Sequence, residues 1–142
     1  MSDQRDALVA RAREAAGRAH APYSGIHVGA AIRAASGAVY AGCNVENASY
    51  PVGNCAEASA IAAGVGVEGD ALRIVETAVW ATDRDGRVVV ASPCGGCRQR
   101  LHEFASPGGV LVHFPWDGGA IRTAKLDDLL PYAFTLGTAR RP

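Results

Sequence analysis

The stretch "PVGNCAEASAIAAG" (residues 51–64) places Cys55 two positions before Glu57, at a point where a loop turns into a helix of small residues. Turn-forming residues precede the cysteine and small apolar residues follow the glutamate, so we expect a helix over residues 55–63 that the next glycines end. A helix that only fills a core needs neither a thiol nor a carboxylate at its start. The stretch therefore predicts a functional site at a helix start.

The length and composition are those of one soluble domain covering residues 1–142. The chain is 49% apolar and 20% charged, which is ordinary for a globular protein. No apolar run approaches the roughly 20 residues that a membrane span needs, and the first twenty residues are charged throughout, unlike a secretory signal. We therefore expect a cytoplasmic protein with no membrane partner.

The formal net charge of the chain is zero, because fourteen basic residues balance fourteen acidic ones. A protein that binds nucleic acid usually shows a basic excess or a basic stripe, so we expect no nucleic-acid partner. A chain without net charge has little charge repulsion to keep it soluble as a monomer. This favours burying part of the surface in an oligomer.

Strand patterns alternate with helix patterns along the chain, which indicates an α/β layered sheet. An expected hairpin with its turn at Ser36–Gly37 makes the sheet mixed rather than parallel. Residues 88–91, "VVVA", are apolar without alternation, and we expect a strand buried on both faces. The other expected helices cover residues 2–21, 94–104 and 125–131. The expected hairpin covers residues 27–44, and the other expected strands cover residues 73–81, 109–114 and 121–124.

Three of the four cysteines lie at predicted helix starts. In "SPCGGCRQR" (residues 92–100), Cys94 and Cys97 are three positions apart and share one helix face. The start of a helix stabilises thiolates, and Cys55 occupies another helix start. Three thiolates can bind zinc and leave a fourth position open, as catalytic zinc sites do.

Glu57 acquires a role from this arrangement. Zinc lowers the pKa of a water that it binds to near neutrality, and a carboxylate beside the metal can accept that proton and pass it to a leaving group. Zinc deaminases combine a ligand-x-Glu string with Pro-Cys-x-x-Cys. Here the strings are "CAE" (residues 55–57) and "PCGGC" (residues 93–97), which together indicate a deaminase.

Four segments resemble the small cytidine deaminases of the three-cysteine, homotetrameric type, and the resemblance covers almost the whole chain. They are "APYSGIHVGAAI" (21–32), "GCNVENASYPVGNCAE" (42–57), "SPCGGCRQ" (92–99) and "LLPYAF" (129–134). The resemblance implies a three-layer αβα fold around a five-stranded mixed sheet. It also implies one zinc ion per chain, held by Cys55, Cys94 and Cys97, with Glu57 as the proton shuttle.

The same resemblance implies how a nucleoside would be held. Asn44 and Glu46 match residues that contact the ribose hydroxyls, and the backbone of Ala56 matches a contact to the pyrimidine carbonyl. Tyr50 lies in the signature and is a candidate for lining the pocket. Phe134 matches a residue that reaches the base from a neighbouring subunit, so the active site would need the homotetramer.

Two positions depart from the family pattern. Many members have an arginine after the glutamate that hydrogen-bonds the ligand sulfurs, and here that residue is Ala58. Zinc with three thiolates is net negative, and a nearby cation offsets this. We expect either that Arg98, next to Cys97, supplies the cation alone or that the metal is less Lewis-acidic than usual. The family usually has an aromatic residue that packs on the base where this chain has Ile26.

The sequence therefore predicts zinc-dependent hydrolysis of cytidine and 2′-deoxycytidine to uridine and 2′-deoxyuridine, with release of ammonia, in pyrimidine salvage. An alternative is the same chemistry on a modified cytosine nucleoside or a blasticidin-like nucleoside. A non-catalytic, zinc-stabilised binding protein is a further alternative. For the cysteines alone, the competing interpretations are a redox-active Cys94–Cys97 pair and a closed structural zinc site with Cys43 as fourth ligand.

Overall fold

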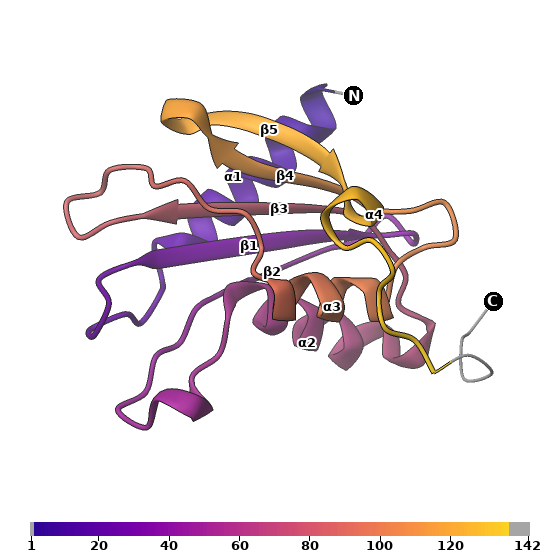
Figure 1. Ribbon diagram of the computed structural model, residues 1–142, viewed down its shortest axis with the longest axis horizontal. Coiled ribbons are helices and arrows are strands. Elements are labelled where there is room, and N and C mark those ends of the chain that lie inside the picture. The colour runs from indigo at the N-terminus through magenta and orange to yellow at the C-terminus, as the bar shows by residue number, and fades with distance from the viewer. Residues whose placement is uncertain (1, 137–142) are drawn as a thin grey trace.

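The computed structural model describes residues 2–136, which form one five-stranded mixed sheet with helices on both faces (Figure 1). The strand order is β2-β1-β3-β4-β5; β3 and β4 are parallel, and the other neighbours are antiparallel. The predicted α/β mixed sheet is therefore confirmed. The strands are β1 (His27–Ala34), β2 (Val39–Cys43), β3 (Ile74–Thr82), β4 (Leu111–Trp116) and β5 (Ala120–Lys125), and the helices are α1 (Ser2–Ala16), α2 (Ala56–Glu68), α3 (Gly95–Glu103) and α4 (Leu126–Leu129).

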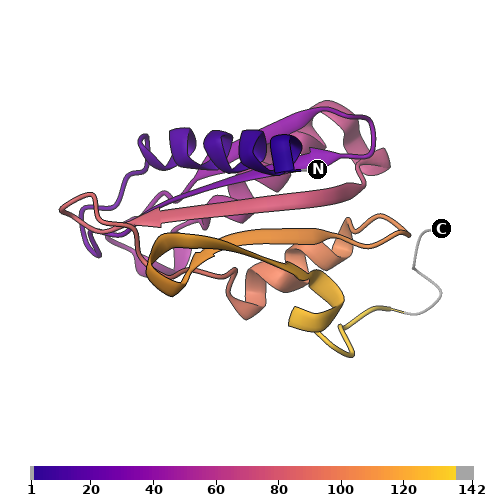
Figure 2. The same cartoon turned by 90° about the horizontal axis from the view of Figure 1, so that it is seen from above.

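The helices form the outer two of three layers (Figure 2). Helix α1 covers one face of the sheet, and α2 and α3 lie together on the other. Each face has its own apolar core. The core under α1 contains Leu8, Ala12, Ala16, Ala31, Ala78 and Trp80, and the larger core under α2 and α3 includes Ile32, Ile61, Leu72, Ile74, Leu101, Val112 and Phe114.

Two glycines allow a helix on each face to touch a strand directly. A Cβ atom at Gly29 in β1 would lie 1.9 Å from the carbonyl oxygen of Ala12 in α1. A Cβ atom at Gly42 in β2 would lie 2.6 Å from the backbone nitrogen of Ala60 in α2. Since backbone atoms fill the space in both cases, any side chain at either position would push a helix off the sheet.

The strand directions explain why α2 and α3 begin at the same place. Strands β2 and β3 are both antiparallel to β1, so they run in the same direction and end at the same edge of the sheet. Helix α2 is the next α-helix after β2, and α3 is the next after β3. Both helices therefore start beyond the carboxyl ends of strands, where ligands bind in open α/β sheets.

The expected end of α2 at Gly64 and Gly66 is wrong. The helix continues to Glu68 and ends at Gly69, whose φ of 62° is in the left-handed region that terminates helices. Gly64 belongs inside the helix because its small size lets the side chains of Tyr40 and Leu72 pack against it. Helix α1 likewise ends at Ala16, before Pro22.

The expected buried strand over residues 88–91 is also wrong. Val88 and Val90 are 39% and 56% exposed. The segment makes single backbone hydrogen bonds, from Val89 N–H to the Ala81 carbonyl and from Ala91 N–H to the Pro115 carbonyl. It therefore crosses from β3 toward α3 over the ends of strands already paired in the sheet. An apolar run forms a sheet strand only where a neighbouring strand still has an unpaired edge, and the run itself does not indicate this.

Within residues 2–136, no helix combines the length and the apolar character that spanning a membrane requires.

The two kinds of glycine environment predict opposite effects of the same substitution. Gly66 lies exposed inside α2 with open space around it, so Gly66→Ala should raise the free energy of unfolding by about 1 kcal/mol through helix propensity. Gly29→Ala should lower it by about 1–3 kcal/mol, because α1 must move away from β1. Urea unfolding at one protein concentration measures both; equal effects of the two substitutions would contradict the packing described here.

Candidate active site

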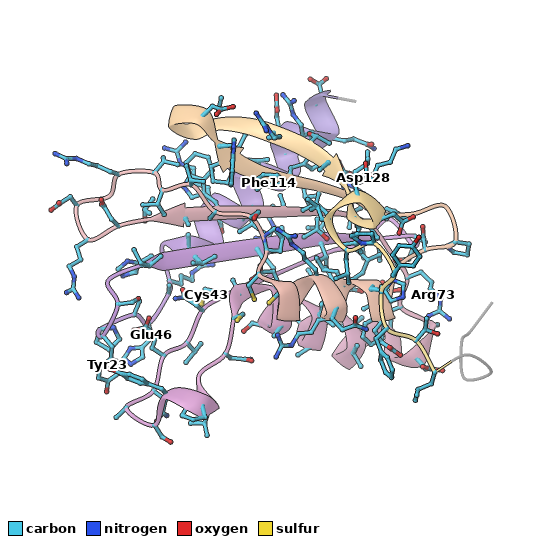
Figure 3. The ribbon with its side chains drawn as sticks, in the orientation of Figure 1. Tyr23, Cys43, Glu46, Arg73, Phe114 and Asp128 are labelled. Carbon is cyan, nitrogen blue, oxygen red and sulfur yellow. The ribbon has the colours of Figure 1, made fainter. Side chains whose placement is uncertain are left out.

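Three cysteines from two helix starts converge at one end of the sheet. Cys55 is the N-cap of α2, Cys94 is the N-cap of α3, and Cys97 lies in the first turn of α3. Their sulfur atoms all lie within 4.8 Å of one another. Figure 3 draws the yellow sulfur atoms where these helices begin. The predicted grouping of these three residues is thus present in the structure.

Cys43, the fourth cysteine, does not belong to this group. It lies at the end of β2, is partly buried and is a free thiol. The cluster formed by the described residues contains only Cys55, Cys94 and Cys97. The site is therefore a three-thiol site and not the closed four-cysteine site.

Glu57 lies beside the sulfurs in the first turn of α2 and is only 5% exposed. Burial raises the pKa of Glu57 above its ordinary value, while its own backbone N–H, the Cys97 thiol and the charge of Arg100 act in the opposite direction. A buried carboxyl group with a raised pKa can both accept and return a proton near neutral pH. This position is the one expected of a proton shuttle.

The thiol cluster is electrostatically suited to a cation. Burial raises the pKa of Cys97, and the negative charges of Glu57, Cys55 and Cys94 raise it further. A metal ion bound among the sulfurs reverses this by stabilising the thiolates. Three sulfur donors with a carboxylate nearby match the ligand chemistry of zinc.

A cavity of about 580 Å³ opens in front of the sulfurs. This volume is in the range of small-molecule sites. Its lining includes Cys55, Ala56, Glu57 and Cys94. The remaining lining residues are Tyr23, Ser24, Val28, Asn44, Val45, Glu46, Asn47, Tyr50, Gly53, Asn54, Val79, Ala91 and Ser92.

Glu46 lines the cavity and also fastens the loop that precedes β1. Its carboxylate accepts hydrogen bonds from the backbone N–H groups of Tyr23 (2.9 Å) and Ser24 (3.1 Å) and from the Ser24 hydroxyl. Figure 3 shows Tyr23 and Glu46 together at this edge of the molecule. The hydrogen bonds from the Ser24 side chain and backbone hold the pKa of Glu46 below its ordinary value.

Asn44 fastens the next part of the same loop. Its Oδ1 accepts a hydrogen bond from Val28 N–H (2.8 Å), and its Nδ2 donates one to the Ile26 carbonyl (2.9 Å). An amide has further hydrogen-bonding capacity on both atoms, so Asn44 can still meet a ligand. The side chain of Val28 lines the cavity, whereas Ile26 is not among the lining residues of the described chain.

The two aromatic candidates occupy different places. Tyr50 lines the cavity, is 73% exposed, and has its ring centroid 5.8 Å from that of Tyr23 in an edge-on arrangement. Phe134 is 67% exposed and does not line the cavity of its own chain. Its carbonyl accepts a hydrogen bond from Gln99 Nε2 (2.9 Å), which holds the C-terminal segment along α3.

Ala56, the first residue of α2, is completely buried and lines the cavity. The first N–H groups of a helix have no acceptor within the helix. The backbone of Ala56 is therefore in the position expected for a hydrogen bond to a ligand carbonyl.

The two arginines of α3 have different partners. The guanidinium of Arg98 donates to the carbonyl oxygens of Pro93 (2.7 Å) and Leu129 (2.8 Å) and to Ser92 Oγ (3.1 Å). These contacts join α3 to the loop before it and to the last residue of α4. Arg100 instead donates from Nη1 to Cys97 Sγ at 3.6 Å.

Two functional features of the site were missed from the sequence. Arg100 had a recognisable signal, because it lies three residues after Cys97 and therefore on the same helix face. Ser24 had none: its hydroxyl meets Glu46 from 22 positions away, through a loop that only the folded chain brings there.

Comparisons with known proteins extend over most of the chain. A sequence-family profile described as "Cytidine and deoxycytidylate deaminase zinc-binding region" matches residues 2–113. The cytidine deaminase of Sporosarcina psychrophila is 38% identical over 128 residues, which cover 90% of this chain and 89% of that protein.

Solved structures give the same result for the fold. The crystal structure of cytidine deaminase from Mycobacterium tuberculosis has a TM-score of 0.74 and 39% sequence identity, covering 92% of this chain and 97% of that one. The cytidine deaminase of Burkholderia pseudomallei has a TM-score of 0.76 and 38% identity, covering 91% and 98%. Similarity of sequence and similarity of backbone thus coincide along the chain.

The hydrogen bonds to Glu46 predict a measurable change in its ionisation. Ser24→Ala should raise the pKa of Glu46 toward its ordinary value, because the largest cause of its lowering is the Ser24 hydroxyl. Carbon-13 NMR titration of the glutamate carboxyls measures this. The pKa of Glu46 is lower in the folded protein than in the unfolded chain. The hydrogen bonds of its carboxylate therefore hold the loop fully at pH values above the ordinary carboxyl pKa, and this stabilisation is lost as the pH falls through the lowered pKa of the folded protein.

Glu68 provides the internal control for this titration. Its pKa is also lowered, by hydrogen bonds from Ser36 and Tyr40, and Ser24→Ala should leave it unchanged. A Glu46 midpoint that stays at the wild-type pH would disprove the role assigned to Ser24.

Proposed function

Because the chain belongs to the cytidine and deoxycytidylate deaminase family, we propose that it hydrolyses cytidine and 2′-deoxycytidine to uridine and 2′-deoxyuridine with release of ammonia. The observation that carries this proposal is the joint position of the three sulfurs and Glu57. The sulfurs lie within 4.8 Å of one another, and the buried carboxyl group faces the same cavity.

We propose that Cys55, Cys94 and Cys97 hold one zinc ion per chain. When bound, zinc acts as a Lewis acid that makes a water molecule nucleophilic near neutral pH. Glu57 accepts a proton from the attacking water and delivers it to N3 of the cytosine ring. It then accepts the remaining proton of the hydroxyl group added at C4 and delivers that proton to the departing 4-amino group. Overall, water adds at C4 and the C4–N bond breaks, so one water is consumed for each ammonia released.

The nucleoside is held by groups around the cavity. We propose that Asn44 and Glu46 contact the ribose hydroxyls. Their positions in the cavity lining and the hydrogen-bonding capacity that they keep beyond their loop contacts support this. We propose that the backbone N–H of Ala56 donates to the pyrimidine carbonyl. Tyr50 lies at the exposed side of the cavity, where it can cover a bound ligand.

The reaction can be followed directly by ultraviolet absorbance. Purified protein of known zinc content should convert cytidine and 2′-deoxycytidine, with loss of the cytosine band. Glu57→Gln should keep zinc and reduce kcat by about 100-fold or more, because positioned proton transfer contributes at least that much.

Cys43→Ser is the matched control, because Cys43 is a free thiol outside the cluster. It should retain both zinc and the wild-type rate. A Glu57→Gln protein with an unchanged kcat would disprove the proton-shuttle role, and a zinc-loaded wild-type protein inactive on both nucleosides would disprove the proposed reaction.

We further propose a cytoplasmic homotetramer formed by a single domain of residues 1–142 and acting in pyrimidine salvage. Large apolar side chains support assembly, because Phe134, Leu136 and Val52 are each at least 65% exposed. Free cysteines are stable in a reducing compartment. Phe134 lies outside the cavity of its own chain, which fits a residue that completes the site of a neighbour.

Mixed oligomers test whether Phe134 acts across subunits. Phe134→Ala should lower kcat/KM about tenfold, as expected for loss of an aromatic contact with the base. Co-expression of Phe134→Ala chains with Glu57→Gln chains should restore activity to part of the Phe134→Ala sites, because the partner still carries Phe134.

The readout is kcat/KM per Glu57-containing chain in the separated hybrid oligomers. Light scattering should give the molar mass of a tetramer for both variants. Hybrids no more active than Phe134→Ala alone would show that the residue does not contribute in trans.

A further inference from the structure

The proposed zinc site has a charge imbalance that its own ligands do not correct. Three thiolates exceed the charge of one Zn²⁺ ion, so the bound cluster is net negative, and Glu57 is buried beside it. Excess negative charge weakens the pull of the metal on a bound water. Residues that contact the metal ligands commonly tune the properties of a metal site, and their mutation typically lowers metal affinity or activity by about 10–100-fold.

Arg100 is placed to supply the missing positive charge. Its Nη1 lies 3.6 Å from Cys97 Sγ, and its charge also acts on Glu57. On α3, Cys94, Cys97 and Arg100 follow one another at intervals of three, so they share one face.

The guanidinium of Arg100 lies close to Gly96. A Cβ atom there would lie 3.4 Å from Arg100 Nη1 and 3.9 Å from Cys94 Sγ. The guanidinium group therefore folds back over Gly96 toward the sulfurs.

We propose that Arg100 is a positioning residue of the metal site, which offsets the thiolate charge from α3 through its hydrogen bond to Cys97. This rests on the proposed function of the same site. The chain has Ala58, a residue without charge, after Glu57 on α2, and Arg98 is occupied by Ser92, Pro93 and Leu129. The positive charge thus reaches the cluster from the second cysteine-bearing helix.

The exposure of Arg100 makes this role separable from folding. The residue is exposed as a whole, and the contact with buried Cys97 comes from one guanidinium nitrogen. Arg100→Gln should therefore preserve the fold while removing the charge.

The test compares zinc-loaded wild-type protein, Arg100→Gln, and Arg100→Gln combined with Ala58→Arg. Arg100→Gln should lower kcat/KM for cytidine about tenfold or more and speed zinc transfer to the chelator pyridylazoresorcinol about tenfold. Ala58→Arg should restore most of both, since it returns a cation to the sulfurs from α2. The circular dichroism spectrum and oligomer size should match wild type throughout.

Arg98→Gln is the comparison on the same helix. It should lower the melting temperature, because it breaks the links to Ser92 and Leu129, and Ala58→Arg should not correct it. The proposal would be overturned if Arg100→Gln showed the same zinc-transfer rate and the same kcat/KM as wild type. It would also be overturned if Ala58→Arg failed to restore the zinc-transfer rate and kcat/KM in the double variant. If wild-type protein is inactive on cytidine but Arg100→Gln still speeds zinc transfer, the proposed function fails and the inference about Arg100 stands.

Discussion

Three sulfur atoms and a buried carboxyl group within one small volume form the constraint on which the rest of this structure depends. Burial, and then the negative charges at Glu57, Cys55 and Cys94, raise the pKa of the Cys97 thiol, so the fully deprotonated cluster is unfavourable unless positive charge is present. Zinc provides that charge in the proposed function, and Arg100 contributes from the protein. The site is thus a balance of charges held by two helices rather than a set of independent ligands.

The fold supplies the rigidity that this balance requires. Helices α2 and α3 start together because β2 and β3 end at the same edge of the sheet. Contact of α2 with the backbone of β2 at Gly42 leaves little freedom for the helix to shift. Since Cys55 caps α2 and Cys94 caps α3, the spacing of the sulfurs follows from the packing of whole elements.

The outer wall of the cavity is built differently, from loops fastened by polar side chains. Glu46 holds the backbone at Tyr23 and Ser24, and Asn44 holds the backbone at residues 26 and 28. In the proposed function the same two side chains also meet the ribose. Recognition of the sugar and the shape of the loop would then depend on the same hydrogen bonds.

The sequence by itself determined the chemistry and the order of elements, because short-range spacing carries both. "CAE" and "PCGGC" place thiols and a carboxylate at helix starts, and alternating patterns indicate a layered sheet. Tertiary structure alone decided that residues 88–91 lie outside the sheet and that α2 passes through Gly64 and Gly66. These outcomes depend on which neighbours fill the surrounding space, and sequence spacing does not encode that competition.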